Sequence, residues 1–180
     1  MDDVKDAKDV KVILYMAQSV NGLIARKNHD EDFLSHENWK CFQGLAEKYG
    51  CFVIGRKTFD IVSNWKEYTF DDINAVRIVV SKQKHLDLPK RYICAKSPKD
   101  ALNVAKSSGF KKIILTGGST INSSFIRQNL VDEMILNIEP YILGSGIGLF
   151  SDDDFTKRLI LKKIIRLRSG IIQLQYTVKK

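Results

Sequence analysis

Three segments of the sequence place glycine and hydrogen-bond donors directly after a run of apolar residues. Glycine lets the backbone adopt positive φ and lets a ligand approach the main chain. A helix that begins after such a turn presents unpaired N–H groups, which suit a phosphate or pyrophosphate. The segments are Asn21-Gly22, Gly55-Arg56-Lys57-Thr58 and Thr116-Gly117-Gly118-Ser119-Thr120, and a fourth apolar run ends at Ser81-Lys82.

These four segments predict a groove for a dinucleotide if their strands lie side by side. In an open α/β sheet, ligands bind outside the carboxyl ends of the strands. The alternative is that the turns bind nothing and the basic side chains are merely solvated, but four such segments in this order favour a groove. If the dinucleotide carries an additional 2′-phosphate, the candidates to bind it are the cationic or hydroxyl side chains of Arg56, Lys57, Ser81 and Lys82.

Other catalytic patterns are absent from the sequence. It contains no Gly-x-Gly-x-x-Gly fingerprint, no Walker phosphate loop and no Gly-x-Ser-x-Gly elbow. The three histidines and three cysteines lack the spacing of metal ligands, so we predict no metal site. These residues are His29, His36, His85, Cys41, Cys51 and Cys94.

The pattern of apolar residues predicts an α/β fold that would position these segments. Apolar runs indicate strands over 12–17, 51–54, 76–80, 92–95, 113–115 and 131–138. Helices are predicted over 36–48, from Ser97 to 107, directly after Gly55 and over 121–126, with Ser35 and Gly50 as the caps of the first. The runs 159–167 and 171–178 indicate an antiparallel hairpin. Strands that alternate with helices predict a mixed, mostly parallel sheet with flanking helices.

Composition places the chain among ordinary globular proteins. With 180 residues, 44% of them apolar, we expect a flexible lead-in over 1–10 and one domain over 11–180. No apolar run is long enough to cross a membrane, and the charged first residues do not resemble a signal peptide, so we expect a cytoplasmic protein. The net charge is +8, but the 29 basic residues are scattered along the chain with 21 acidic residues among them. This pattern makes nucleic acid an improbable partner.

Four segments together resemble the dihydrofolate-reductase-like family. They are Met16-Ala17-Gln18-Ser19-Val20-Asn21-Gly22-Leu23-Ile24-Ala25, Val53-Ile54-Gly55-Arg56-Lys57-Thr58-Phe59, Ile114-Leu115-Thr116-Gly117-Gly118-Ser119 and Leu130-Val131-Asp132-Glu133. They look most like the branch that contains the reductase domain of the riboflavin-biosynthesis deaminase–reductase and its stand-alone relatives. The segment 139–150 and the hairpin around Ser169-Gly170 support that branch.

The resemblance implies a three-layer fold that binds NADPH in an extended pose, and a homodimer. It also implies hydride transfer to a pyrimidine or pteridine-type heterocycle, as in a 5-amino-6-(5-phosphoribosylamino)uracil reductase. By resemblance, the pyrophosphate would lie against Thr116, Gly117, Gly118, Ser119 and Thr120. The adenosine-side phosphates would lie against Gly55, Arg56, Lys57 and Thr58, with Ser81 and Lys82 beside them. The nicotinamide would be bordered by Ala17, Asn21, Gly22, Leu23 and Ile24.

The catalytic acid is less well defined. The family's first loop usually reads Asp-Gly, whereas this chain has Asn21-Gly22, and an amide does not supply a carboxylate's charge. Asp32 and Glu37, just before and within the first turn of the helix over 36–48, are the candidate proton donors. Either acid would equally suit the positive end of the helix dipole without catalysing anything. Two alternatives therefore stay open: a dihydrofolate reductase proper, and a non-catalytic protein that binds nucleotides or nucleic acid.

Overall fold

The computed structural model describes residues 10–83, 86–151 and 154–180. The predicted lead-in over 1–10 lies outside the described residues except for Val10. That side chain is only 3% exposed and packs into the core.

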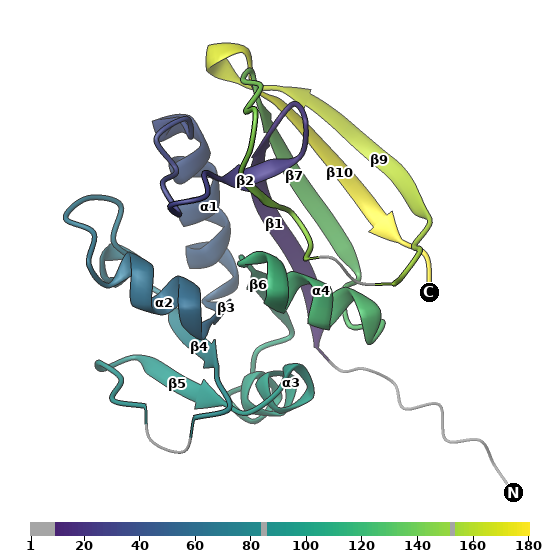
Figure 1. Ribbon diagram of the computed structural model, residues 1–180. Coiled ribbons are helices and arrows are strands. Elements are labelled where there is room, and N and C mark those ends of the chain that lie inside the picture. The colour runs from purple at the N-terminus through teal and green to yellow at the C-terminus, as the bar shows by residue number, and fades with distance from the viewer. Residues whose placement is uncertain (1–9, 84–85, 152–153) are drawn as a thin grey trace, which may run out of the picture.

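The described residues form an eight-stranded sheet whose order is β5-β4-β3-β6-β1-β7-β10-β9 (Figure 1). The first six of these strands run parallel to one another, whereas β10 pairs antiparallel with both β7 and β9. This confirms the predicted parallel sheet with an antiparallel C-terminal hairpin. The strands are β1 (Lys11–Ser19), β3 (Cys51–Gly55), β4 (Val76–Val80), β5 (Tyr92–Ala95), β6 (Lys112–Leu115), β7 (Glu133–Glu139), β9 (Leu159–Arg166) and β10 (Ile172–Val178).

The helices begin and end at the residues that local chemistry favours. In α1 (His36–Tyr49) the Ser35 side chain accepts a hydrogen bond from the Asn38 N–H, and Gly50 closes the helix at φ 73°. In α3 (Pro98–Ser107) the Ser97 side chain accepts from the Asp100 N–H in the same way. The other two helices, α2 (Arg56–Val62) and α4 (Ser119–Arg127), begin directly after Gly55 and Gly118.

The sheet lies between two helical layers because side chains alternate along its buried strands. Leu14, Val53 and Leu115 face a core that includes side chains of α3 and α4. Tyr15, Ile54 and their neighbours face a second core that includes Phe42 of α1 and the end of α2. Both faces of the central strands are therefore apolar, which explains their continuous apolar runs.

One small sheet was not predicted from the sequence. The strand β2 (Leu23–Ala25) pairs antiparallel with β8 (Ile147–Gly148) in the segment after β7. These strands are too short to show an alternating pattern. A Cβ on Gly146 would lie 2.3 Å from the Ala25 carbonyl oxygen, so glycine permits this close approach. The small sheet fixes the chain between β1 and α1 against the segment after β7.

A fully buried arginine anchors the segment between α2 and β4. Arg77 lies in β4 and is 1% exposed. Its guanidinium donates hydrogen bonds to the backbone carbonyls of Phe70, Ile73 and Ala75. Phe70 begins the short helix η1 (Phe70–Asp72), and its ring packs against Phe52 of β3. Arg77 therefore fixes the path of a segment whose side chains contribute to the site described below.

Candidate functional site

The four strand ends identified in the sequence lie side by side. The strands β4, β3, β6 and β1 are consecutive neighbours in the sheet and all run in the same direction, so their carboxyl ends share one edge (Figure 1). Two backbone hydrogen bonds join the central pair of turns: Gly55 N–H donates to the Gly117 carbonyl at 2.8 Å, and Thr116 N–H donates to the Val53 carbonyl at 3.0 Å.

A basic groove of about 570 Å³ runs along this edge. The groove passes over the start of α4, where the first-turn N–H groups of a helix have no partners within the helix. Its charged lining includes more cations than acids among the described residues, which suits a polyanion. The lining includes Lys27, His29, Glu31, Gly55, Arg56, Lys57, Thr58, Gly118, Ser119 and Thr120.

The glycine pair between β6 and α4 leaves no room for side chains. Gly117 has φ 85°, and a Cβ there would lie 3.1 Å from the Met16 sulfur. A Cβ on Gly118 would lie 3.3 Å from the Thr58 hydroxyl oxygen. The peptide bond between the two glycines is cis. Positive φ therefore favours glycine at Gly117, and a side chain at either position would press against its neighbours; of the pair, Gly118 lines the groove.

A second cavity, of about 610 Å³, adjoins the groove and is rich in aromatic side chains. Trp39 of α1 is central to it: its ring lies stacked on Phe70 at 6.2 Å between centroids and edge-on to Tyr68 at 5.5 Å. Flat aromatic walls favour a planar ligand. The lining includes Tyr15, Ala17, Asn38, Trp39, Phe42, Trp65, Tyr68, Phe70 and Thr116.

The two cavities meet at four residues that line both: Ile24, Glu31, Thr58 and Val62. Glu31 is the ionisable member of this set. The residue is half-buried, and desolvation of its carboxyl group, helped by the charge of Asp30, raises its pKa to about 7. At neutral pH a large fraction of Glu31 therefore carries a proton at the junction of the two cavities.

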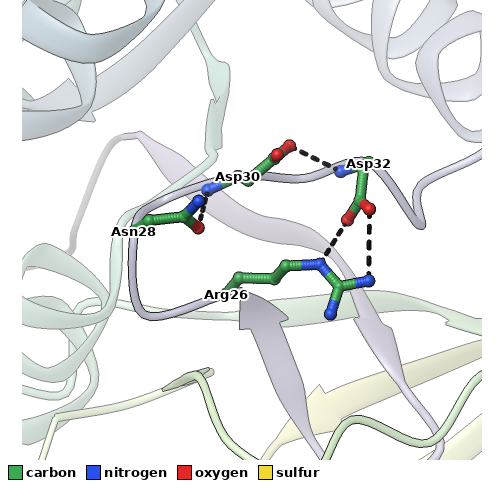
Figure 2. A network of polar contacts seen from close by, with 4 residues as sticks. All are labelled: Arg26, Asn28, Asp30 and Asp32. Atoms are coloured by element: carbon green, nitrogen blue, oxygen red, sulfur yellow. Dashed lines mark hydrogen bonds and ion pairs between the residues drawn. The ribbon is translucent and has the colours of Figure 1, made fainter.

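The loop that carries Glu31 is held by its own hydrogen bonds (Figure 2). The Arg26 guanidinium contacts both carboxylate oxygens of Asp32, at 2.6 and 3.1 Å. Asn28 and Asp30 accept from the backbone N–H groups of Asp30 and Asp32, respectively. Asp30 and Asp32 are exposed, whereas the intervening Glu31 is half-buried. All three acids line the aromatic cavity, and Glu31 is the one that is partly shielded from solvent.

The two acids predicted as proton donors lie in different surroundings. Asp32 lines the aromatic cavity, but its hydrogen bonds with Arg26 lower the pKa of its carboxyl, which favours the charged form. Glu37 lies in the first turn of α1 and is not part of the lining of either cavity. Sequence reasoning missed Glu31, because nothing in the run Asp30-Glu31-Asp32 distinguishes its middle member.

The structure also explains the amide at Asn21. Its side chain donates to the Leu143 carbonyl at 2.7 Å and accepts from the Leu143 N–H at 3.1 Å. A carboxylate would accept but not donate. Asn21 therefore joins the turn after β1 to the segment after β7. Asn21, Gly22 and Leu23 lie outside the lining of both cavities, although the next residue, Ile24, lies at their junction.

The end of β4 contributes less to the groove than the sequence predicted. Val80 lines the groove, whereas Ser81 and Lys82 do not. Ser81 is 5% exposed, and its hydroxyl accepts from the Gln83 N–H at 3.1 Å. Of the predicted cofactor residues, the structure brings together at the two cavities Ala17, Ile24, Gly55, Arg56, Lys57, Thr58, Thr116, Gly118, Ser119 and Thr120.

A chain of buried side-chain amides lies under the aromatic cavity. The Tyr15 hydroxyl donates to Asn38 Oδ1 at 2.6 Å, and the Asn137 amide donates to the same oxygen at 3.0 Å. Gln173 of β10 in turn donates to Asn137 Oδ1 at 3.0 Å. Buried polar groups of this kind hold one another in fixed orientations. Asn38 is thereby fixed in the wall of the cavity.

The described residues contain neither a cluster of metal ligands nor a membrane-spanning helix. Within ranges 10–83, 86–151 and 154–180, no group of three His, Cys, Asp or Glu side chains is placed to hold a metal ion. His85 lies outside these ranges. In the same part of the chain, no helix is both long and apolar enough to span a membrane.

Comparison with known proteins identifies the family of this chain and shows which proteins share its fold. Residues 10–173 match the model of the RibD C-terminal domain family. An uncharacterised protein of Bacillus subtilis strain 168, YyaP, is 28% identical over 94% of this chain and 95% of its own length. The fold is similar to that of a pyrimidine reductase-like protein from Corynebacterium diphtheriae, with a TM-score of 0.78, 16% identity and coverage of 96% and 93% of the two chains.

A dihydrofolate reductase from Enterococcus faecalis has a similar fold too, with a TM-score of 0.71 at 14% identity over 94% of this chain and 97% of the reductase. That structure is a complex with NADP(H). These likenesses confirm the predicted three-layer, dihydrofolate-reductase-like α/β fold.

Proposed function

The chain belongs to the RibD C-terminal domain family, and from this membership we propose that it is an NADPH-dependent reductase acting on a pyrimidine or pteridine-type heterocycle. The observation that carries the proposal is the junction of two cavities: a basic groove that suits a dinucleotide and an aromatic cavity that suits a planar ring meet at Ile24, Glu31 and Thr58. Hydride transfer requires two rings to be held together in this way.

The groove fits NADPH through its charge and its shape. Gly118, Ser119 and Thr120 line the groove where α4 begins, and a pyrophosphate would lie against this helix start. Ser119 and Thr120 would contact the pyrophosphate, and Lys57 would contact the 2′-phosphate. The bound nicotinamide would supply the hydride. The residues of this chain would orient the two rings, exclude water and deliver a proton, and we propose Glu31 as the proton donor.

Lys57 is expected to determine the preference for NADPH over NADH. It is exposed at the start of α2 and lines the groove, whereas its helical neighbour Arg56 is paired with Asp60. Replacing Lys57 by Ala should weaken NADPH binding about 10-fold to 100-fold and leave NADH binding unchanged, because a charge-assisted hydrogen bond contributes about 1.5–3 kcal/mol. Isothermal titration calorimetry with both dinucleotides measures the difference.

Lys82→Ala is the matched control for Lys57→Ala. Lys82 is exposed at the end of β4 but does not line the groove, so its removal should change NADPH affinity less than about threefold. A larger loss at Lys82 than at Lys57 would place the 2′-phosphate at β4, as the sequence alone suggested, and would contradict the assignment to α2.

The reaction itself is tested by following the absorbance of NADPH. We expect oxidation of NADPH in the presence of an aminopyrimidine or pteridine substrate and none without it. Dihydrofolate is included as a comparison substrate, since turnover of dihydrofolate alone would support a dihydrofolate reductase proper. A protein that binds NADPH but oxidises it with none of these heterocycles would count against the proposal.

We also propose that the chain forms a homodimer through the edge strand β9. Ile160, Leu161 and Ile164 of this strand are 47%, 50% and 59% exposed, and an uncovered edge with apolar side chains favours pairing with another chain. Light scattering should give twice the chain mass of 20.5 kDa. Ile164→Lys should give a monomer that still binds NADPH.

The control for this dimer is Ile142→Lys. Ile142 is 78% exposed and lies in the segment after β7, not in the edge strand β9. The account predicts that this variant stays dimeric. Dissociation by Ile142→Lys but not by Ile164→Lys would move the interface away from β9, and a monomeric parent protein would exclude the dimer.

A further inference from the structure

We propose that the aromatic cavity takes an unphosphorylated, planar nitrogen heterocycle that presents a hydrogen-bond acceptor to the side-chain amide of Asn38. The inference rests on the reductase function proposed above and narrows its substrate class. It follows from the charge of the cavity, from the shape of its walls and from one free donor in them.

The charge of the cavity disfavours a phosphate. Its described lining includes four acids, Asp30, Glu31, Asp32 and Glu67, against the single cation Lys66. Asp32 is neutralised by its ion pair with Arg26, and Glu31 is partly protonated at neutral pH because its pKa is raised to about 7. The excess of negative charge therefore comes from Asp30 and Glu67, against Lys66. A phosphate monoester carries a charge of about −1.5 to −2 at neutral pH and would meet these carboxylates directly. The neighbouring groove has the opposite balance, so the site separates an anionic cofactor from a substrate that is neutral or cationic.

The walls of the cavity favour a flat ring. The rings of Tyr68 and Phe70 lie 5.5 and 6.2 Å from the ring of Trp39 by their centroids, and Trp65 lines the same space. Aromatic side chains bury a planar heterocycle without requiring charge. The walls therefore supply binding surface for a ring but little that would hold a ribose phosphate.

Asn38 supplies a directional contact. The side chain is only 8% exposed and lines the cavity. Its Oδ1 already accepts from the Tyr15 hydroxyl and the Asn137 amide, while its Nδ2 donates to no group within the described part of the chain. This donor has no protein partner, and a ring carbonyl or ring nitrogen of a ligand in the cavity would accept a hydrogen bond from it.

The test compares two ligands that differ only in phosphate. The protein is first saturated with NADP⁺, and tryptophan fluorescence is then titrated with 5-amino-6-ribosylaminouracil and with its 5′-phosphate. The unphosphorylated compound is expected to bind about 10-fold more tightly or better. Equal or tighter binding of the phosphate would overturn the inference. Failure to bind NADP⁺ at the first step would instead count against the proposed reductase, so the two failures are distinguishable.

Two substitutions test the negative charge of the cavity and the Asn38 side-chain amide independently. Glu67→Lys should raise the affinity for the 5′-phosphate about 10-fold, whereas Glu133→Lys, at the opposite end of the strands, should leave it unchanged. Asn38→Asp retains an acceptor for Tyr15 and Asn137 but replaces the free donor. It should weaken binding of the unphosphorylated uracil about 10-fold with NADP⁺ affinity unchanged. Unchanged uracil binding in Asn38→Asp would exclude the amide contact.

Discussion

Replacing Glu31 by Gln is expected to lower kcat about 10²-fold to 10³-fold, with little change in NADPH affinity. A positioned acid contributes about 10²-fold to 10⁴-fold to a reaction that requires a proton. Glu31 lines both cavities, so its carboxyl lies where the two rings would meet, and glutamine preserves the shape but has no proton to give. Stopped-flow measurement of a single turnover, together with a fluorescence titration of NADPH, separates chemistry from binding.

Glu37→Gln is the matched control for this substitution. It makes the same chemical change at an acid of α1 that lines neither cavity, and it should leave kcat within about twofold of the parent protein. If Glu37→Gln abolished turnover while Glu31→Gln did not, the original candidate from the sequence would be the donor. If both variants kept full activity, neither acid would be the essential proton source.

The pH dependence of kcat gives Glu31 a second signature. Burial raises the pKa of this carboxyl to about 7, so its protonated form predominates below that pH and decreases above it. The rate should therefore be level in mild acid and fall about tenfold per pH unit above 7. Besides burial, the charge that acts on Glu31 is that of Asp30 from its own loop. A flat profile from pH 6 to 9 would argue against Glu31.

The same carboxyl should also make folding depend on pH. Its pKa is raised in the folded chain, so the unfolded chain ionises first as the pH rises. The contribution of Glu31 to stability is therefore complete below its unfolded pKa and decreases between about pH 4.5 and 7. Glu31→Gln should flatten this part of the stability profile.

Replacing Arg77 by Met is expected to lower the free energy of unfolding by about 3–5 kcal/mol. The substitution removes the guanidinium as a donor to the carbonyls of Phe70, Ile73 and Ala75. The Phe70 and Ile73 carbonyls keep a backbone donor, whereas the Ala75 carbonyl loses its donor, and an unsatisfied buried group costs about 1–3 kcal/mol. It also removes the guanidinium that lies over the ring of Tyr92, at 5.2 Å from the centroid. Urea denaturation followed by circular dichroism measures the loss.

The control is Arg91→Met. Arg91 is exposed, and its guanidinium donates to the exposed Asn74 side chain, so its loss should change stability by no more than about 0.5 kcal/mol. Because Arg77 fixes the segment that brings Trp65 and Tyr68 to the cavity, Arg77→Met should also weaken heterocycle binding. A loss of less than about 1 kcal/mol in Arg77→Met would show that its hydrogen bonds are replaced by solvent.

The main elements of the fold could be predicted because their signals are local. A continuous apolar run identifies a strand covered on both faces, as in β1 and β3, and Ser35 and Gly50 define the ends of α1 by their own backbone chemistry. Short strands have no such signal. The pairing of β2 with β8 depends on residues more than 100 positions apart, and its two and three residues are too few to show a period.

The candidate site could be predicted only in part for a similar reason. The turns at the strand ends could be predicted because the glycine residues that form them, such as Gly118, can be recognised in the sequence. The role of Asn21 was not visible, because its partner Leu143 is 122 residues away. The choice among Asp30, Glu31 and Asp32 depends on which carboxylate Arg26 binds, and sequence spacing does not reveal that contact.

The central claim, that the edge of the sheet is a cofactor groove, is tested most directly by titrating the protein with NADPH while following energy transfer from tryptophan to the nicotinamide. Trp39 and Trp65 line the cavity that adjoins the groove, so bound NADPH should quench them. The account predicts saturable binding of NADPH, weaker binding of NADH, and loss of this preference in Lys57→Ala. Absence of saturable binding of either dinucleotide would contradict the account.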